Sequence, residues 1–412
     1  MESIDLEGSS GAKANVALIQ NLHKAGYDLI VFHYTRKDIQ LQGIKCVAIQ
    51  ERRFSGLFLL SRLERHFRYI YRIKLNELIE KIFGFSFTLL NDRNSIIAAL
   101  KKYSGPEPDL ILTLSQAGSF RPHHALLRMP ELHEKWIAYI HDPYPMHLYP
   151  RPFNWVEPGY HQKWKFMWDV SEKAAYSAFP GKLLKEWMGS YYPGLLKTGV
   201  IIPHQIIDLP VLNVRFPAYY KPGNFNLLHA GALLRPRNPQ SLVLAFQSFL
   251  DRNPEAREQS KLILVGSSSI HSTWLKIKEN EIRELEIIDE KLPFPTVFKM
   301  QQTAAVNIIL EAKAEISPFL PGKFPHCVQA DKPILLLGPN YSECRRLLGD
   351  DYPFWAEIDD TEKITVIIEN LYFEWKKSPE RLKLERPDLV SYLSCSYLEK
   401  TLEGILSNDI SG

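Results

Sequence analysis

The stretch FNLLHAGALLRPRNPQSLVLAF, residues 225–246, contains the three parts from which α/β domains are built. An apolar run ends at Gly231, a loop with Arg235 and Arg237 follows, and a helix begins with proline at its first position. The runs KLILVGSS, which turns at Gly266, AAVNIILEA and KPILLLGP continue the alternation. Short apolar runs separated by helices predict a parallel sheet. We therefore expect a doubly wound α/β domain in the second half.

The first half has the same order of elements. GSSGAKANVALIQNLHKAGYDLIVFHY reads as a glycine loop, a helix from about Lys13 to Lys24 and a strand over 28–34. LILTLS and KWIAYIH are further buried-strand runs, whereas ESIDLE, before Gly8, is a poor strand. The proline-rich segment 201–224 separates the two halves. We expect domains over residues 1–210 and 211–387, with C-terminal helices over 388–412.

Bulk composition excludes several classes of protein. A chain of 412 residues is long enough for two domains, and its net charge of +3 argues against wholesale nucleic-acid binding. The four cysteines form no CxxC pair, which favours reduced thiols. We find no secretory h-region and no run of eighteen apolar residues. The expected protein is cytoplasmic, or peripheral on the inner face of a membrane.

Basic side chains occur where a parallel sheet binds ligands. Arg235 and Arg237 precede a helix, and in PFLPGKFPHCVQADKPIL the turn residue Gly322 is followed by Lys323, which opens another helix. Ligands bind beyond the carboxyl ends of parallel strands, and a diphosphate suits arginine, lysine and helix N-termini. The alternative is that all three side chains are solvated surface residues.

The order of these segments resembles a known family. LLHAGALLRPRNP, LILVGS and PFLPGKFPHCVQADKPIL are similar to the nucleotide-sugar-binding domain of GT-B glycosyltransferases, especially the retaining family 4 type. The resemblance covers residues 225–350 well and the N-terminal half more loosely. It implies two Rossmann-like domains facing an interdomain cleft, and C-terminal helices that cross back to the N-terminal domain.

The resemblance also implies a donor site. The residues that would bind the donor are Gly231, Arg235, Arg237, Gly266, Lys323 and His326. Two departures stand out: Ala232 occupies a frequent arginine position, and His326 replaces the glutamate that commonly binds the ribose. His326 could bind a hydroxyl group or lie at the edge of the core. We expect no metal and no cofactor, because cationic side chains and a helix N-terminus would stabilise the leaving diphosphate.

His141 and Asp142 are the candidate catalytic residues. They lie in YIHDPYP, which looks like the family's His-Asp-Pro or His-Glu-Pro element at the end of an N-domain strand. The resemblance places His141 beside the transferred sugar, and Asp142 could orient the ring or cap the next turn. The alternative for a histidine at the end of a strand is a hydrogen-bonded core residue.

Two further segments have an open interpretation. Gly8, Ser9, Ser10 and Gly11 resemble the loop that meets acceptor or phosphate in this fold, although a simple turn fits as well. In residues 52–74 the side chains Leu60, Leu63, Phe67 and Ile70 share one helical face, and Arg62, Arg65, Arg68 and Arg72 line the other flank. This basic helix could dock on an anionic membrane or pack in the core.

The resemblance therefore implies a metal-independent hexosyltransferase that uses a nucleoside-diphosphate sugar and retains the anomeric configuration. Its acceptor would be a glycan or lipid-linked sugar in surface polysaccharide synthesis, and no nucleic acid is expected as a partner. Two alternatives remain. A nucleotide-sugar 2-epimerase shares the fold but needs a carboxylate pair, and a degenerate, non-catalytic GT-B scaffold would tolerate Ala232 and His326.

Overall fold

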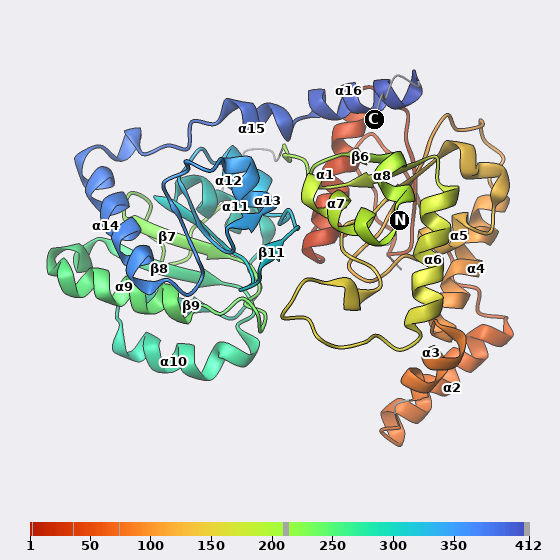
Figure 1. The fold of residues 1–412 in the computed structure, drawn as a ribbon, viewed down its shortest axis with the longest axis horizontal. Helices are drawn as coiled ribbons and strands as arrows, with labels where there is room; N and C mark the ends of the chain where they lie inside the picture. Colours follow the sequence, from red (N-terminus) through yellow and green to blue (C-terminus); the bar gives the residue numbers. More distant parts are fainter. Residues whose placement is uncertain (2, 36, 74, 209–213, 408–412) are drawn as a thin grey trace. The chain divides into compact units, whose positions relative to one another are not determined.

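Parallel strands alternate with helices along the chain, which a computed structural model describes over residues 1, 3–35, 37–73, 75–208 and 214–407. Two units result, both drawn in Figure 1. The first contains Met1–Tyr149, Phe153–Pro203 and the chain from Cys395, and the second contains Pro150–Pro152 and His204–Ser394. The boundary predicted at residues 210–211 lies outside the described residues.

The second unit is built on a six-stranded sheet with the order β14-β12-β10-β7-β8-β9, in which each neighbouring pair is parallel. Its strands are β7 (Phe225–Ala230), β8 (Ser260–Val265), β9 (Leu285–Ile288), β10 (Val306–Leu310), β12 (Ile334–Leu337) and β14 (Trp355–Ala356). A small parallel pair joins β11 (Ile316–Ser317) and β13 (Tyr341–Ser342). The α-helices are α9 (Gln240–Arg252), α10 (Ser272–Glu281), α11 (Phe294–Thr303), α12 (Phe324–Gln329), α13 (Glu343–Leu348), α14 (Thr361–Lys377) and α15 (Pro387–Tyr392). Short 3-10 helices are η3 (Pro254–Glu258), η4 (Ser269–His271) and η5 (Pro379–Arg381).

Burial on both faces explains the composition of this sheet. Every residue of β10 and β12 is buried, as expected for central parallel strands. Helix α9 packs against α14 and buries Phe246 and Phe249 in the same core as Ile368 and Leu371. Burying a side chain of this size contributes about 1.5–3 kcal/mol.

The first unit has two separately hydrogen-bonded parallel sheets among its described residues. One pairs β1 (Ile30–His33) with β2 (Lys45–Ala48). The other has the order β3-β4-β5-β6, with β3 (Ile111–Leu114), β4 (Trp136–Tyr139), β5 (Tyr176–Phe179) and β6 (Gly199–Ile201). The helices are α1 (Ser10–Lys24), α2 (Gly56–Ile70), α3 (Leu75–Phe83), α4 (Phe87–Lys101), α5 (Arg121–Leu126), η1 (Pro130–Lys135), η2 (Met146–Leu148), α6 (Tyr160–Lys173), α7 (Lys182–Tyr191) and α8 (Gly194–Thr198).

The segment before Gly8 forms no strand over its described residues, but the backbone of Met1 bonds to β1. The Met1 amino group donates to Phe32 O over 2.8 Å, and Met1 O accepts from Tyr34 N over 3.1 Å. The predicted helix 13–24 begins earlier, at Ser10, because the Ser9 side chain caps it.

The helix α16 (Cys395–Leu406) belongs to the first unit, although the preceding α15 belongs to the second. Helix α16 packs against α1, and Leu398 and Leu402 share a core with Val16 and Ile19. The chain therefore returns to the first unit at Cys395, after passing through the whole second unit. The residues from 408 to 412 lie outside the described part.

None of the helices that the structure describes is both long and apolar enough to cross a bilayer.

Candidate functional site

Gly231 directly follows β7, and its backbone lies against the side chain of Lys323. A Cβ atom added at Gly231 would lie 2.8 Å from Lys323 Nζ, too close for non-bonded atoms, and 3.2 Å from Lys323 Cε, a tight contact. Gly231 also has φ +156°, a backbone conformation that residues with side chains rarely adopt. Glycine at this position therefore lets the lysine reach the carboxyl end of the sheet.

Lys323 is half-buried beside the buried ring of His229, with Nζ 3.4 Å from Nδ1 and 3.5 Å from Nε2. Burial, followed by the charge of Arg237, lowers the pKa of Lys323 to about 7. Burial also lowers the pKa of His229 well below its usual range, and the charges of Lys323 and Arg237 act in the same direction. The imidazole is therefore neutral near pH 7, and the ammonium group beside it loses its proton easily.

Among the residues that the structure describes, these cations have no carboxylate within ion-pair distance. In the part of the chain that the structure describes, no ion pair involves Arg235, Arg237 or Lys323. Arg237 is half-buried, and its charge lowers the pKa of both Lys323 and His229, whereas Arg235 is exposed. Cations that form no direct ion pair at the carboxyl ends of parallel strands suit an anionic ligand.

Glu311 is a buried carboxylate at the same edge, directly after β10. Ser317 Oγ donates to Glu311 Oε1 over 2.9 Å, and a Cβ added at Gly338 would lie 2.4 Å from Oε2. Burial raises the pKa of Glu311 to about 7, against the opposing effects of Ser317 and other hydrogen-bond donors and of Arg237. Glu315, in the segment that follows, is exposed. Among the described residues, no three His, Cys, Asp or Glu side chains group as metal ligands.

Gly266 lies against Gly231, whereas His326 packs against α11. Gly266 has φ +125°, and a Cβ added there would lie 2.6 Å from Gly231 O, so this glycine allows the end of β8 to approach Gly231. His326 is buried on α12, and its ring lies edge-on to Phe294 and Phe298 of α11, with centroids 5.3 Å and 5.7 Å apart. This packing fits the interpretation of His326 as a residue at the edge of the core.

In the first unit, His141 lies just beyond the end of β4 and is buried. Ser115, which directly follows the neighbouring β3, bonds to it twice: Ser115 Oγ lies 3.2 Å from His141 Nδ1 and accepts from His141 N over 3.1 Å. The ring also packs on Tyr139, with centroids 4.4 Å apart and the ring planes tilted by 40°. These contacts fix the orientation of the imidazole, and Asp142 follows as a half-buried residue.

The glycine loop lies near the same sheet edge. Ser9 Oγ accepts from Ala12 N over 3.2 Å at the start of α1, and Gln116 Nε2 donates to Ser9 Oγ over 2.7 Å. A Cβ added at Gly11 would contact Gln116 Cγ at 3.3 Å. Ser115 and Gln116 thus connect two segments that the sequence named separately, the loop Gly8–Gly11 and His141.

Four site residues escaped the sequence interpretation: His229, Glu311, Ser115 and Gln116. Each lies at the end of an apolar run or directly after it: His229 in HAG, Glu311 in LEA, and Ser115 and Gln116 in LSQ. The available signal was a polar residue at a strand end, since such residues meet at the carboxyl edge of a parallel sheet.

No family model and no curated protein matches the chain. Solved structures match over nearly the whole length. A UDP-forming α,α-trehalose-phosphate synthase from Burkholderia xenovorans is 11% identical, with 100% of this chain and 99% of that chain covered and a TM-score of 0.63. Anabaena HepE in complex with UDP and glucose is 12% identical, with 99% of both chains covered and a TM-score of 0.60. A glycosyltransferase from Rickettsia africae is 12% identical, covers 100% of this chain and 98% of that chain, and has a TM-score of 0.61.

At this level of identity the likeness establishes the fold. The chain has the GT-B fold with its Rossmann-like domains, which confirms the fold class predicted from the sequence. The assignment to family 4 stays a prediction.

Proposed function

We propose that this protein is a glycosyltransferase that transfers a sugar from a nucleoside-diphosphate sugar to an acceptor. The observation that carries the proposal is the cationic cluster of Lys323, Arg237 and neutral His229 around Gly231. The fold supports it, because the HepE structure of the same fold holds UDP and glucose.

In this proposal the donor diphosphate lies against Gly231, Lys323 and Arg237. The missing side chain of Gly231 allows close approach, and Lys323 donates from a site where burial strengthens electrostatic contacts. Negative charge grows on the diphosphate as the glycosidic bond breaks, and the two cations stabilise it. The reaction would then need no metal, and the anomeric configuration would be retained, as the family resemblance implies.

His141 would contact the transferred sugar or the acceptor from the first unit. The contact of its Nδ1 with Ser115 and the packing on Tyr139 hold the ring in one orientation, which a residue that touches reacting atoms requires. The proposed acceptor is a glycan or a lipid-linked sugar, and the proposed role is surface polysaccharide synthesis.

The first experiment is a thermal-shift and calorimetric screen with a panel of nucleoside diphosphates and their sugars. Lys323→Gln and Arg237→Gln should each weaken nucleotide binding about tenfold or more, because each removes a charge-assisted contact. The control Arg252→Gln, an exposed arginine on α9, should bind as the wild type does. Failure of every nucleoside diphosphate to bind would contradict the proposal.

The second experiment separates an enzyme from the scaffold alternative. His141→Ala should lower turnover about a hundredfold or more while nucleotide affinity stays within about twofold. The control is His161→Ala, which removes an exposed histidine of α6. Unchanged turnover in His141→Ala would contradict the role that we propose for His141. Wild-type protein that binds nucleotide sugars but transfers none of them would favour the scaffold.

A further inference from the structure

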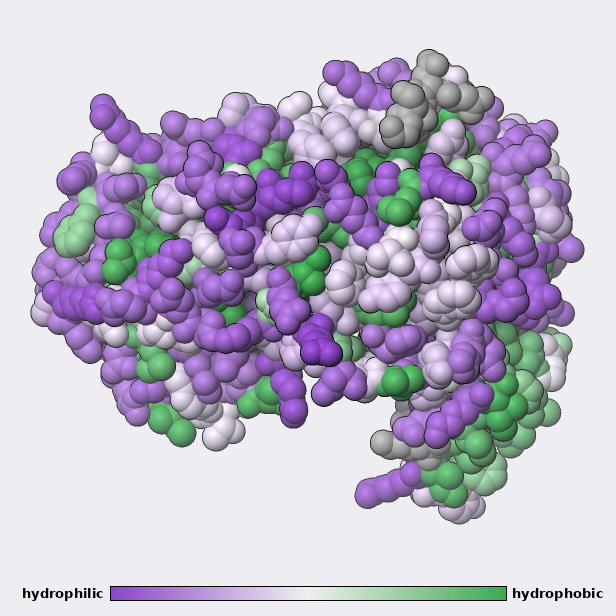
Figure 2. Space-filling view, in the orientation of Figure 1, coloured by the Kyte–Doolittle hydropathy of each residue, from purple (hydrophilic) through white to green (hydrophobic). Residues whose placement is uncertain are grey.

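Helices α2 and α3 turn apolar side chains towards solvent. On α2, Leu59, Leu60, Leu63, Phe67 and Ile70 keep between 39% and 61% of their surface exposed, and on α3, Leu78, Ile82 and Phe83 keep between 54% and 59%. We call these side chains the outer stripe. Figure 2 shows hydrophobic side chains gathered over these two helices. The alternative that the basic helix packs its apolar face into the core is therefore wrong.

The inner side of α2 is polar instead. Its buried residues are Ser61 and Glu64. Ser61 Oγ donates to Phe58 O over 2.8 Å, and Arg68 pairs with Glu64 at 3.8 Å. An amphipathic helix usually buries its apolar face, so α2 is inverted relative to an ordinary surface helix.

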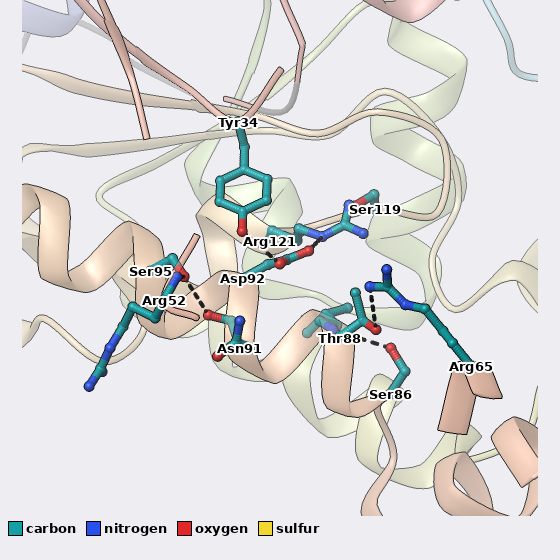
Figure 3. Close-up of polar contacts among 11 residues, drawn as sticks. Tyr34, Arg52, Arg65, Ser86, Thr88, Asn91, Asp92, Ser95, Ser119 and Arg121 are labelled. Atoms are coloured by element: carbon teal, nitrogen blue, oxygen red, sulfur yellow. Dashed lines mark hydrogen bonds and ion pairs between the residues drawn. The ribbon is translucent and has the colours of Figure 1, made fainter. Parts of the chain in front are cut away.

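Helix α4 explains why α2 buries its polar side. It presents polar residues to α2 and to the rest of the first unit (Figure 3). Arg65 Nη2 donates to Thr88 Oγ1 over 3.3 Å, and Ser55 Oγ, which caps α2, donates to Asn91 Oδ1 over 2.7 Å. One turn further on, Ser95 Oγ accepts from the backbone of the loop that leads into α2. The polar face of α4 thus selects the polar side of α2 and leaves the outer stripe uncovered.

Polar anchoring also fixes α3. Its Glu80 pairs at 2.8 Å with Lys163 of α6, which is buried and also pairs at 2.6 Å with Glu157. Asn76 Nδ2 donates to Glu80 Oε1 over 3.2 Å on the same helix. Two helices are therefore held by polar contacts on one side while their apolar residues face outward.

Positive charge borders the outer stripe along α2. Arg62 and Arg72 are exposed, and Arg65 and Arg68 are half-buried on the flank of α2. The loop that enters α2 also lines a cavity of about 740 Å³ in the first unit. Its basic lining residues are Lys45, Arg52, Arg53 and Lys102, and among the described residues Glu51 is its one acid. Lys74, the last basic residue of the stretch, lies outside the described part.

We propose that α2 and α3 form a docking surface for a bilayer that contains anionic phospholipids. The outer stripe would enter the boundary between headgroups and acyl chains, and the flanking arginines would contact lipid phosphates. Charge complementarity selects this occupant, since an apolar surface bordered by arginines fits an anionic interface better than an apolar protein face. The inference rests on the first unit alone and does not depend on the proposed sugar transfer.

Vesicle co-sedimentation without donor or acceptor tests the proposal. The wild type should bind vesicles with about one third phosphatidylglycerol and bind neutral phosphatidylcholine vesicles at least tenfold more weakly, because each basic residue near the surface contributes about fivefold to partitioning. Arg62→Gln should lower the partition coefficient on anionic vesicles about fivefold. Leu63→Gln combined with Phe67→Gln should lower it about tenfold or more, because it removes inserting apolar surface.

Each variant has a matched control in the second unit. Lys376→Gln is the control for Arg62→Gln, because Lys376 of α14 is exposed and forms an ion pair of 3.8 Å, as Arg62 forms one of 3.9 Å. Leu244→Gln, which removes an exposed leucine of α9, is the control for the apolar variant. Both controls should bind vesicles as the wild type does. Circular dichroism and thermal melting would show that each variant is folded.

Three results would overturn the proposal. One is equal binding to neutral and anionic vesicles, and another is no vesicle binding by folded wild-type protein. The third is a dimer in light scattering that is lost in Leu63→Gln while vesicles are not bound, which would show that a second copy covers the outer stripe.

Discussion

The pKa of Lys323 leads to a quantitative prediction for nucleotide binding. Burial lowers this pKa to about 7 in the free protein, so about half of the molecules carry a neutral lysine at that pH. A diphosphate that contacts the ammonium group would favour the charged form and raise the pKa in the complex. Binding above pH 7 must therefore take up a proton, and affinity must fall as the pH rises.

The size of the effect follows from linkage. If the complex keeps Lys323 protonated, the dissociation constant scales as one plus the ratio of neutral to charged lysine in the free protein. This factor rises about 16-fold between about pH 7 and about pH 8.5, which corresponds to about 1.6 kcal/mol of binding free energy. The terminal phosphate of the nucleotide ionises near pH 6, so it contributes little in this window.

Isothermal titration calorimetry with the tightest-binding nucleoside diphosphate would measure both quantities. Repeating it in two buffers with different ionisation enthalpies should give uptake of about half a proton at pH 7 and about one at pH 8.5. Lys323→Gln should bind more weakly at pH 7 and lose most of the pH dependence. Glu311→Gln should keep the slope that Lys323 causes, although Glu311 itself titrates near pH 7.

Two results would refute this reasoning. The first is a wild-type affinity that stays constant across the window. The second is a slope of the same size in Lys323→Gln, which would assign the proton to another group.

Three further substitutions, the last with a control, test the packing and the buried charges of the two units. Gly231→Ala should weaken nucleotide binding at least tenfold and lower the free energy of unfolding in urea by about 1–3 kcal/mol, because its Cβ meets Lys323 and its φ is unfavourable. Burial raises the pKa of Glu311 from 4.5 to about 7, so its contribution to stability is present below pH 4.5 and is lost as the pH rises through 7. The melting temperature of Glu311→Gln should therefore rise relative to that of the wild type between about pH 5 and about pH 8, and a constant difference would contradict this. Asp92→Ala should cost about 2–4 kcal/mol of unfolding free energy, because it removes the buried carboxylate that accepts from Tyr34 Oη and pairs with Arg121. Asp169→Ala, which breaks an exposed ion pair of α6, should cost less than about 1 kcal/mol in the same assay.

Glycines and cations at the ends of apolar runs made much of the second unit predictable. Ligands bind beyond the carboxyl ends of parallel strands, and the family resemblance implied that Gly231 and Lys323 meet at the donor diphosphate. His229 and Glu311 could not be predicted in this way, because each follows apolar residues and resembles part of a strand. The contact of His229 with Lys323 and the effect of Arg237 on Glu311 depend on the sheet order, which places β7 between β10 and β8.

The basic stretch shows a different limit of sequence patterns. The spacing of Leu60, Leu63 and Phe67 predicts that they share a face of a helix, and they do. It does not predict which face is buried, because that depends on the partner helix. The partner is α4, whose Asn91 and Ser95 lie in contact with the segment around α2.

The return of α16 to the first unit affects how the chain folds during synthesis. Leu398, Leu402 and Ile405 complete a core that also contains residues of α1, yet they leave the ribosome only after the entire second unit. Synthesis of the first unit therefore begins before that of the second unit but ends after it. The surface of α1 that α16 covers stays exposed to solvent while residues 204–394 emerge. We expect an isolated fragment that ends at Pro203 to expose this surface and aggregate, unless α16 is supplied as a separate peptide.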